Sequence, residues 1–395
     1  MKVPFLDLKR QYETIRDEVL DAIHAVLESQ NFILGYEVEK LEEEISGYCG
    51  SPNAIGVASG SDAILISIMA LDLQPGAGVI TTPFTFFATA GSISRLGCIP
   101  IFVDIDPLTF NLDPNKLREF IESRCDLDRK GQLFSRDKKV PIRGVLPVHL
   151  FGQSADMNPI LELCCENDLG VIEDAAQAIG SSYKPASDQP GRFAGTMGEA
   201  GCFSFYPSKN LGAFGDGGMV ICKDSTLADR IRILRAHGSR PKYYHRLVGL
   251  NSRLDAIQAV ILRVKLKYLD QWSEARRQNA LQYDRLFRDS DCEGFGISLP
   301  FTQYENHHIF NQYVIRVSQR DELREFLQAH SIGTDIYYPL PLHLQECYRH
   351  LGHREGDFPV AEEASRTVLA LPIFPEITTE EQRYVVEKIV TFYRS

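Results

Sequence analysis

Lys209 stands between a short apolar segment and a glycine-rich stretch, and it is the strongest candidate for chemistry in this sequence. The apolar side chains of Cys202, Phe203 and Phe205 predict a buried strand before it. Four glycines follow within residues 212–218, where the backbone can stay close to a ligand. An amine held at the end of a packed strand can be desolvated, which lowers its pKa and allows it to form a Schiff base. A surface lysine in a flexible loop explains these residues equally well when they are considered alone.

A second segment ends on an acidic pair, Glu173-Asp174, directly after the apolar residues Val171 and Ile172. In open parallel sheets, ligands bind at the carboxyl ends of the strands. A lysine and a strand-end aspartate are the pair that pyridoxal 5′-phosphate (PLP) requires, because the carboxylate keeps the pyridine nitrogen protonated. Asp174 alone could be a helix cap. Both features occur in one chain about one strand unit apart, which favours the cofactor site.

The turn Ser59-Gly60-Ser61-Asp62 precedes an apolar helical segment and offers a place for the cofactor phosphate. Backbone N–H groups and the dipole at a helix N-terminus bind anions. The hydroxyl of Ser204 is the second candidate for the phosphate. Ser61 and Asp62 are also ordinary N-cap residues, so the turn alone would indicate only a cap.

Composition describes an ordinary globular chain of 395 residues, with 44% hydrophobic and 24% charged residues. Its length predicts two domains. The net charge of −11 argues against a nucleic-acid or anionic-membrane surface. We see no signal peptide, membrane span or metal-binding spacing, and the nine scattered cysteines are typical of a reduced, cytoplasmic protein.

The elements that must position these residues alternate between strand and helix from about residue 50 to residue 240. This order predicts a mostly parallel sheet with helices on both faces. Between the sheet elements, the polar run 124–139 is expected to be a surface excursion without chemistry. The expected strands are 54–58, 79–82, 99–103 and 142–149, and the expected helices are 63–71, 87–96, 117–121 and 159–167.

Beyond residue 247 the pattern changes to long helices, with one strand at 313–317 and a terminal helix around 380–390. We therefore expect a large PLP-binding α/β domain over residues 16–248 and a smaller α+β domain over residues 249–395. An N-terminal segment, residues 1–15, joins them. The amphipathic helix around residues 12–26 has no strand before it and is expected to pack across the domains.

Several motifs in combination resemble those of the DegT-like nucleotide-sugar aminotransferases. These are PLP enzymes of the aspartate-aminotransferase fold (fold type I), with a mostly parallel sheet in the large domain. The resemblance runs nearly end to end. The motifs are Ser59-Gly-Ser-Asp-Ala63, Thr82-Pro-Phe-Thr-Phe86, Pro147-Val-His-Leu-Phe-Gly152, Glu173-Asp-Ala-Ala-Gln177, Phe203-Ser-Phe-Tyr-Pro-Ser-Lys-Asn210 and Gly249-Leu-Asn-Ser-Arg-Leu-Asp255.

The resemblance implies a role for each residue that contacts the cofactor. Lys209 would form the Schiff base, Asp174 would pair with the pyridinium nitrogen and Gln177 would bond the ring hydroxyl oxygen. Phe86 would stack on the ring face.

The resemblance also implies how the phosphate is held. Ser204 and the backbone of Gly60 and Ser61 would bind it, with Ser61 standing where the family usually has threonine. Asn251 would reach the phosphate from the other subunit, so the active sites would be shared within a homodimer.

On the sugar side the resemblance is weaker. Arg240 and Arg253 are candidates for the diphosphate, and His149 is interpreted as structural. The histidines expected near the sugar could equally be solvated loop residues. The residues in segments that family members use around the nucleotide-sugar are Tyr183, His308, Tyr313, Tyr338 and His343.

The reaction implied is transfer of an amino group from a donor, expected to be glutamate, to a keto-sugar nucleotide, through pyridoxamine phosphate. Lys209 would act as general acid and base. Family dehydratases carry histidine at the lysine position, which separates them from this chain. Residues 242–258 and 308–313 are similar to the branch that aminates C3, with C4 amination as the alternative. An NAD-dependent oxidoreductase is disfavoured because no GxGxxG follows the first strand, and a non-catalytic regulator of the same fold stays open.

Overall fold

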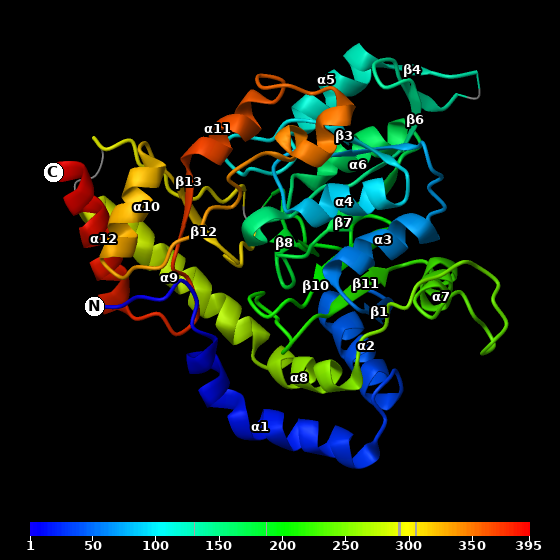
Figure 1. The fold of residues 1–395 in the computed structure, drawn as a ribbon, viewed down its shortest axis with the longest axis horizontal. Helices are drawn as coiled ribbons and strands as arrows, with labels where there is room; N and C mark the ends of the chain where they lie inside the picture. Colours follow the sequence, from blue (N-terminus) through cyan, green and yellow to red (C-terminus); the bar gives the residue numbers. More distant parts are fainter. Residues whose placement is uncertain (130, 187, 291–293, 305) are drawn as a thin grey trace.

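A computed structural model describes residues 1–395 apart from 130, 187, 291–293 and 305. Its centre is a nine-stranded sheet with helices on both faces, and a smaller group of helices and a two-stranded sheet lies at one end (Figure 1). No helix in these described ranges is both long and apolar enough to cross a membrane.

Six of the seven strands along the main path of the sheet run in the same direction. β11 is antiparallel to both of its neighbours, whereas β10, β7, β6, β2 and β3 pair in parallel. The mostly parallel sheet is therefore confirmed. In spatial order the strands are β1 (Asn53–Val57), β11 (Gly218–Cys222), β10 (Ala200–Ser204), β7 (Gly170–Asp174), β6 (Val140–Val145), β2 (Gly78–Thr81) and β3 (Ile99–Phe102).

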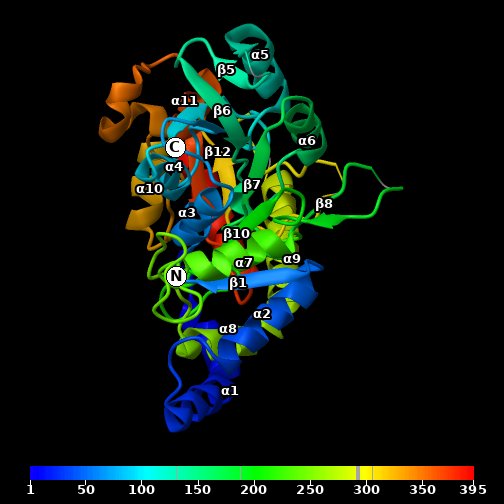
Figure 2. The ribbon, with the colours of Figure 1, turned by 90° about the vertical axis from the view of Figure 1, so that its right-hand side faces the viewer.

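Alternating strand residues supply two separate cores, one on each face of the sheet. Val220 faces the core beneath α3 and α7, while its neighbour Ile221 faces the core beneath α2 and α8. Figure 2 shows α3 and α4 on one side of the strands and α2 and α6 on the other. The helices of this part are α2 (Tyr36–Cys49), α3 (Gly60–Ala70), α4 (Phe87–Arg95), α5 (Pro114–Arg124), α6 (Met157–Glu166) and α7 (Ser225–Leu234).

Two details differ from the sequence expectation. The polar run after α5 contains β4 (Cys125–Leu127) and β5 (Leu133–Ser135), which pair with each other and add β5 to the edge of β6. The strand expected over 142–149 ends at Val145 as β6, because the chain turns into a 3₁₀ helix, η1 (Leu150–Gly152). Between them Val148 still makes a parallel bridge to Asp174, so this segment stays beside the end of β7.

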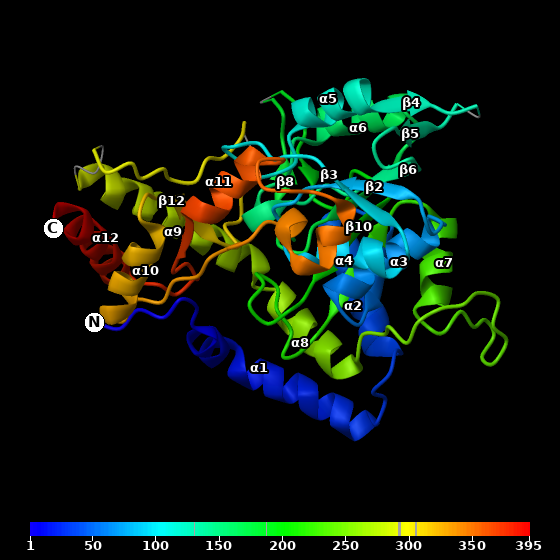
Figure 3. The same ribbon diagram turned by 45° about the horizontal axis from the view of Figure 1, so that its top comes forward.

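The C-terminal elements share one buried core with residues beside the large sheet, among them Phe84, Phe102 and Val148. β12 (Tyr313–Arg316) and β13 (Val368–Leu371) pair antiparallel, and α10 (Arg320–Ala329) and α12 (Thr379–Arg394) cover them together with α9 (Leu269–Asp289). Both chain termini lie beside this group (Figure 3). The remaining elements are η2 (Leu342–Leu344), η3 (Glu346–Leu351), α11 (Pro359–Thr367) and the short pair β8 (Ser182–Tyr183) and β9 (Arg192–Phe193).

The N-terminal helix α1 (Leu8–Ser29) packs along α8 (Ala256–Leu266), where Ile15 and Val19 contact Ile261 and Val264. α8 in turn shares a buried core with β10 and β11. α8 follows residue 249 in sequence, yet it packs on the large sheet. The domain boundary expected at residue 249 stays a prediction.

Candidate active site

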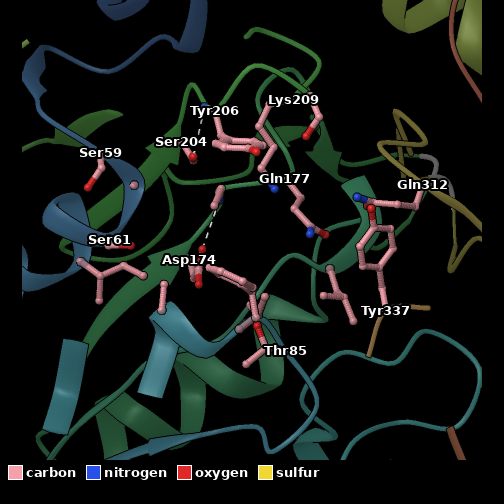
Figure 4. Close-up of a pocket in the computed structure, with 18 of the residues that line it drawn as sticks. Ser59, Ser61, Thr85, Asp174, Gln177, Ser204, Tyr206, Lys209, Gln312 and Tyr337 are labelled. Atoms are coloured by element: carbon pink, nitrogen blue, oxygen red, sulfur yellow. Dashed lines mark hydrogen bonds between the residues drawn. The ribbon is translucent and has the colours of Figure 1, made fainter. Parts of the chain in front are cut away.

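Lys209 lies in the turn after β10, at the carboxyl edge of the sheet (Figure 4). Its N–H donates to the Tyr206 carbonyl at 2.9 Å. The turn needs Gly212, because a Cβ there would lie 2.3 Å from the Pro207 carbonyl oxygen. Burial of the Lys209 amine lowers its pKa from 10.5 to about 8, although the charge of Asp174 raises it. A usable share of the amine is therefore uncharged near neutral pH.

Asp174 is the last residue of β7 and is only 6% exposed. Its Oδ2 accepts a hydrogen bond from the Thr89 hydroxyl at 2.7 Å, and its Oδ1 accepts one from the Ala176 N–H at 3.2 Å. Burial raises the pKa of this carboxyl, while the two donors and the Lys209 charge act in the opposite direction. A protonated ring nitrogen in the cavity would favour the ionised carboxylate further. Asp174 thus fits the role of a pyridinium partner.

Gln177 has its amide orientation fixed by two neighbours. Its Oε1 accepts from the Phe151 N–H at 2.7 Å, so its Nε2 faces the Tyr338 hydroxyl at 3.3 Å. An amide nitrogen carries two hydrogens. The one that Tyr338 leaves free can donate to a ring oxygen.

The N-terminus of α3 forms the opposite end of the cavity. The Ser59 hydroxyl caps the helix by accepting from the Asp62 N–H at 3.1 Å, whereas the first N–H groups of a helix have no partner within it. Gly60 allows the end of β10 to approach the helix closely, because a Cβ at position 60 would lie 2.5 Å from the Cβ of Ser204. The Ser61 backbone and the Ser204 hydroxyl therefore border the same end of the cavity, where they could hold an anion.

These groups line a single cavity of about 490 Å³, in the size range of small-molecule sites. Figure 4 shows Ser59, Ser61 and Ser204 at one end, Gln312 and Tyr337 at the other, and Lys209 between them. Together, an amine, a buried carboxylate, an amide and a place for an anion are the groups that PLP requires. The predicted residues that the cavity brings together are Gly60, Ser61, Phe86, Asp174, Gln177, Ser204, Lys209 and Tyr338.

Three residues expected at the sugar are placed elsewhere. The Tyr183 hydroxyl donates to Asp156 at 2.6 Å and the Tyr313 hydroxyl donates to Asp284 at 2.7 Å. His343 pairs with a glutamate on α11 at 3.0 Å. All three are at most 1% exposed and none lines the cavity. In this structure the three side chains belong to the core of their own chain, and each pairs with an acidic residue. Their contact with the sugar nucleotide stays a prediction.

His308 lies near the cavity without lining it. Its ring stacks on Phe310 with a centroid distance of 3.8 Å, and its Nδ1 accepts from the Phe310 N–H. It borders a smaller hollow that shares Leu150 and Gln312 with the cavity. Burial lowers the pKa of His308 to about 3, so the ring is neutral.

Asn251 and the two candidate arginines lie outside the cavity of their own chain. Asn251 is exposed on the long segment between α7 and α8. Arg240 pairs with Asp229 at 3.4 Å on the surface, and Arg253 is partly buried just before α8. A contact between Asn251 and the phosphate of a partner subunit stays a prediction.

His149 is fully buried against Glu173, as its structural interpretation expects. Its Nδ1 accepts from the Ala155 N–H at 3.0 Å, so its Nε2 carries the hydrogen that it donates to Glu173 at 2.8 Å. The same carboxylate accepts from the N–H groups of Gly195, Met197 and Gly198. This network connects residues 195–198 to Glu173, the residue before Asp174 at the end of β7.

Sequence reasoning missed several residues that line or support the cavity, and these include Tyr337, Gln312, Thr85 and Thr89. Tyr337 and Gln312 line it beside Tyr338, and Thr85 lines it next to Phe86. Thr89 supports Asp174 from the first turn of α4. The spacing of Thr85 and Thr89, four residues apart where a helix begins, could have placed both hydroxyls on one face.

Comparison with known protein families identifies the family to which this chain belongs. Residues 13–390 match the DegT/DnrJ/EryC1/StrS aminotransferase family. The chain belongs to this family. Close relatives in the family are PLP-dependent sugar aminotransferases, and this protein is a PLP-dependent aminotransferase of the nucleotide-sugar class.

Three curated relatives match over almost their whole lengths. A "pleiotropic regulatory protein" of Geobacillus stearothermophilus is 47% identical, covering 100% of this chain and 99% of the relative. A UDP-N-acetyl-3-dehydro-α-D-glucosamine 3-aminotransferase of Acidithiobacillus ferrooxidans is 38% identical, with 99% and 97% covered. A dTDP-3-amino-3,4,6-trideoxy-α-D-glucose transaminase of Streptomyces venezuelae is 39% identical, with 98% and 95% covered.

A solved structure agrees with the fold. The structure of DesV from S. venezuelae, in complex with a ketimine intermediate, is 38% identical and superposes with a TM-score of 0.90. It covers 100% of this chain and 99% of its own. The fold expected from the sequence motifs is therefore confirmed.

Proposed function

We propose that this enzyme converts a 3-keto hexose linked to dTDP or UDP into the 3-amino sugar, with glutamate as amino donor. The observation that carries the proposal is the pairing, in one cavity, of the half-buried Lys209, whose pKa is lowered to about 8, with the buried Asp174. Amination at C3 is supported by two relatives named as acting at that carbon, one with UDP and one with dTDP. It is also supported by the sequence of residues 242–258 and 308–313.

PLP, when bound, supplies the electron sink and carries the amino group between donor and acceptor. Asp174 would stabilise the protonated ring nitrogen, and Gln177 would donate to the ring oxygen. The N-terminus of α3 and Ser204 would hold the phosphate, while Phe86, which is 60% exposed on the cavity wall, would cover the ring face.

Lys209 moves the proton in both halves of the reaction. Its uncharged amine would take the proton from the α-carbon of the donor, and the resulting ammonium would supply a proton to the cofactor when PLP is bound. The lowered pKa makes both directions accessible near neutral pH, since neither form of the amine is strongly favoured over the other. The second half, with the keto sugar, reverses these transfers.

The sugar would occupy the end of the cavity away from α3. Gln312 and Tyr337 line that end (Figure 4) and offer an amide and a hydroxyl group, and Tyr338 contributes a second hydroxyl to the same cavity. Such groups recognise sugar hydroxyls by hydrogen bonds. A sugar that lacks a matching hydroxyl would leave these protein groups without a partner and would bind more weakly.

We propose further that the active unit is a homodimer in which Asn251 of one subunit completes the phosphate site of the other. The proposal is supported by the exposure of large apolar side chains near the cavity and on the segment that carries Asn251. Phe86, Tyr206 and Phe214 are 60%, 56% and 45% exposed. Val248, three residues before Asn251, is 91% exposed, as expected for surface that a partner covers.

An assay of 3-keto and 4-keto sugar nucleotides side by side, with glutamate as donor, tests the carbon that is aminated. We expect turnover of the 3-keto compounds and a yellow protein with the absorbance of lysine-bound PLP. Turnover of only the 4-keto compounds would refute the C3 proposal and leave the enzyme class intact.

A regulatory role is a second candidate, favoured by the name of the 47% identical relative. A non-catalytic regulator would have no need for the amine of Lys209 and the carboxylate of Asp174 in one cavity. A protein that neither binds PLP nor turns over any keto sugar would favour the regulator.

A further inference from the structure

Two threonine hydroxyls connect the cavity wall to Asp174 and have no role in the proposed function so far. Thr89 is fully buried in the first turn of α4, and its Oγ1 lies 2.7 Å from Asp174 Oδ2. An ionised carboxylate can only accept, so the Thr89 hydroxyl is the donor. Its single hydrogen is thereby assigned.

The second hydroxyl belongs to Thr85. Its Oγ1 lies 3.0 Å from Thr89 Oγ1. Because the hydrogen of Thr89 is already directed at Asp174, Thr85 must be the donor in this pair. The two threonines therefore form a chain of donors that starts at a cavity-lining residue and ends on the carboxylate.

Two further hydrogen bonds hold the two threonines in place. The Thr82 hydroxyl accepts from the Phe84 N–H at 3.1 Å and fixes the turn before α4. The Thr89 N–H donates to the carbonyl oxygen of Phe86 at 3.2 Å. The residue expected to cover the cofactor ring is thus on the same rigid turn as the donors to Asp174.

We propose that Thr89 is a positioning residue that aims the ionised Asp174 carboxylate at the cofactor's ring nitrogen, and that Thr85 orients the Thr89 hydroxyl. This inference rests on the proposed function, because it assumes a ring nitrogen that Asp174 must meet. A buried carboxylate is held in its charged form by hydrogen bonds donated to it. Without Thr89 the donor that remains to the Asp174 carboxylate among the described residues is the Ala176 N–H, at the longer distance of 3.2 Å.

The test uses the full-length protein and four variants. Thr89→Val removes the hydroxyl with little change of volume, Thr89→Ser keeps it, and Thr85→Val removes the second donor. Thr81→Val is the matched control: Thr81 is fully buried on β2, and its hydroxyl donates to the Leu146 carbonyl at 2.8 Å, away from Asp174. The measurements are the dissociation constant of PLP from the apoprotein and the pH titration of the absorbance of lysine-bound PLP.

We expect Thr89→Val to weaken PLP binding on the order of tenfold, since hydrogen bonds to charged groups contribute this much. The midpoint of its absorbance titration should move, whereas Thr81→Val should match the wild type in both measurements. Thr89→Ser should restore both, and Thr85→Val should weaken PLP binding about threefold, as a neutral hydrogen bond does.

Wild-type affinity and titration in Thr89→Val would overturn the inference, and so would a Thr89→Ser variant as impaired as Thr89→Val. If Thr89→Val does not fold, Thr85→Val decides, and unchanged PLP binding in that variant overturns the chain of donors. Failure of the wild-type apoprotein to bind PLP would instead overturn the proposed function. The two failures are distinguishable because only the second removes the wild-type signal.

Discussion

At the scale of residues, the site depends on a half-buried amine and a buried carboxyl whose environments move their pKa values toward each other. Burial lowers the pKa of Lys209 and raises that of Asp174, while each charge partly counteracts the shift of the other. The amine can therefore give and take a proton near neutral pH. The carboxyl needs further positive charge or donors to stay ionised, which a ring nitrogen and Thr89 provide.

Replacement of Lys209 by alanine or arginine should leave a folded protein, because the residue lies in a turn. Both variants should lose the absorbance of lysine-bound PLP and more than about 100-fold of activity, because among the described residues no other lysine lines the cavity to move the proton. Lys116→Ala, at a lysine on the surface of α5, is the control and should keep both properties. Transamination at the wild-type rate in either Lys209 variant would contradict the assignment.

Asp174→Asn should retain the cofactor but lose most activity, roughly 100-fold, because a neutral amide cannot stabilise a pyridinium charge. Steady-state kinetics and the PLP content of the purified variant check this together. If the rate stays near that of the wild type, Asp174 is only structural.

The rate of PLP capture by the apoprotein should depend on pH through Lys209. Below pH about 8 the amine is protonated, so the rate should rise about tenfold per pH unit and then level off above that pH. In Asp174→Asn the plateau should begin at lower pH, because the charge that raises the pKa of Lys209 is gone. Stopped-flow absorbance measures both profiles, and identical midpoints would show that the two groups are not coupled.

Residues at the ends of strands were easier to place from the sequence than tyrosines, which can serve either in a binding site or in a core. The segments around Lys209, Asp174 and Gln177 each follow a strand, so local pattern alone brings them to one sheet edge. Tyr183 and Tyr313 are amphipathic and serve as well in a core, once a carboxylate satisfies the hydroxyl. Only the tertiary fold supplies that carboxylate.

At the scale of elements, the turn after β10 and helix α8 act together. Lys265 of α8 donates to the Gly212 carbonyl at 2.6 Å, and Gln258 of the same helix accepts from the Phe214 N–H at 2.9 Å. The loop that carries Lys209 is thus held against a helix outside the sheet. The sequence predicted both elements but not their contact, because no local pattern records which surface a glycine-rich loop will meet.

Gly212→Ala should displace this loop, because the new Cβ would meet backbone rather than a movable side chain. We expect a loss of about 2 kcal/mol in the free energy of unfolding and weaker PLP binding. Gly215→Ala is the matched control in the same loop, since a Cβ there would lie 3.3 Å from the flexible amide of Gln258. Chemical denaturation and PLP titration compare the two, and equal behaviour would show that the turn tolerates a side chain.

At the scale of the whole molecule, the sequence predicted the architecture well because strand and helix alternate with clear apolar periods. It missed the β4–β5 extension, where short polar strands lack such a period. The boundary at residue 249 depends on packing, and α8 packs on the large sheet although it follows that residue. The relation between two copies of the chain is still less visible from the sequence, since it depends on surfaces rather than on cores.

Shared active sites predict a complementation between two inactive chains. In a homodimer each site would use Lys209 of one subunit and Asn251 of the other. A Lys209→Ala chain mixed with an Asn251→Ala chain then forms hybrids with one intact site and one site that lacks both residues. At equal mixing about half of the dimers are hybrids, so about a quarter of the wild-type activity should return. Unmixed samples of each variant are the controls, and sedimentation reports the dimer. Activity no greater than the sum of the controls, or a fully active monomer, would show that each chain completes its own site.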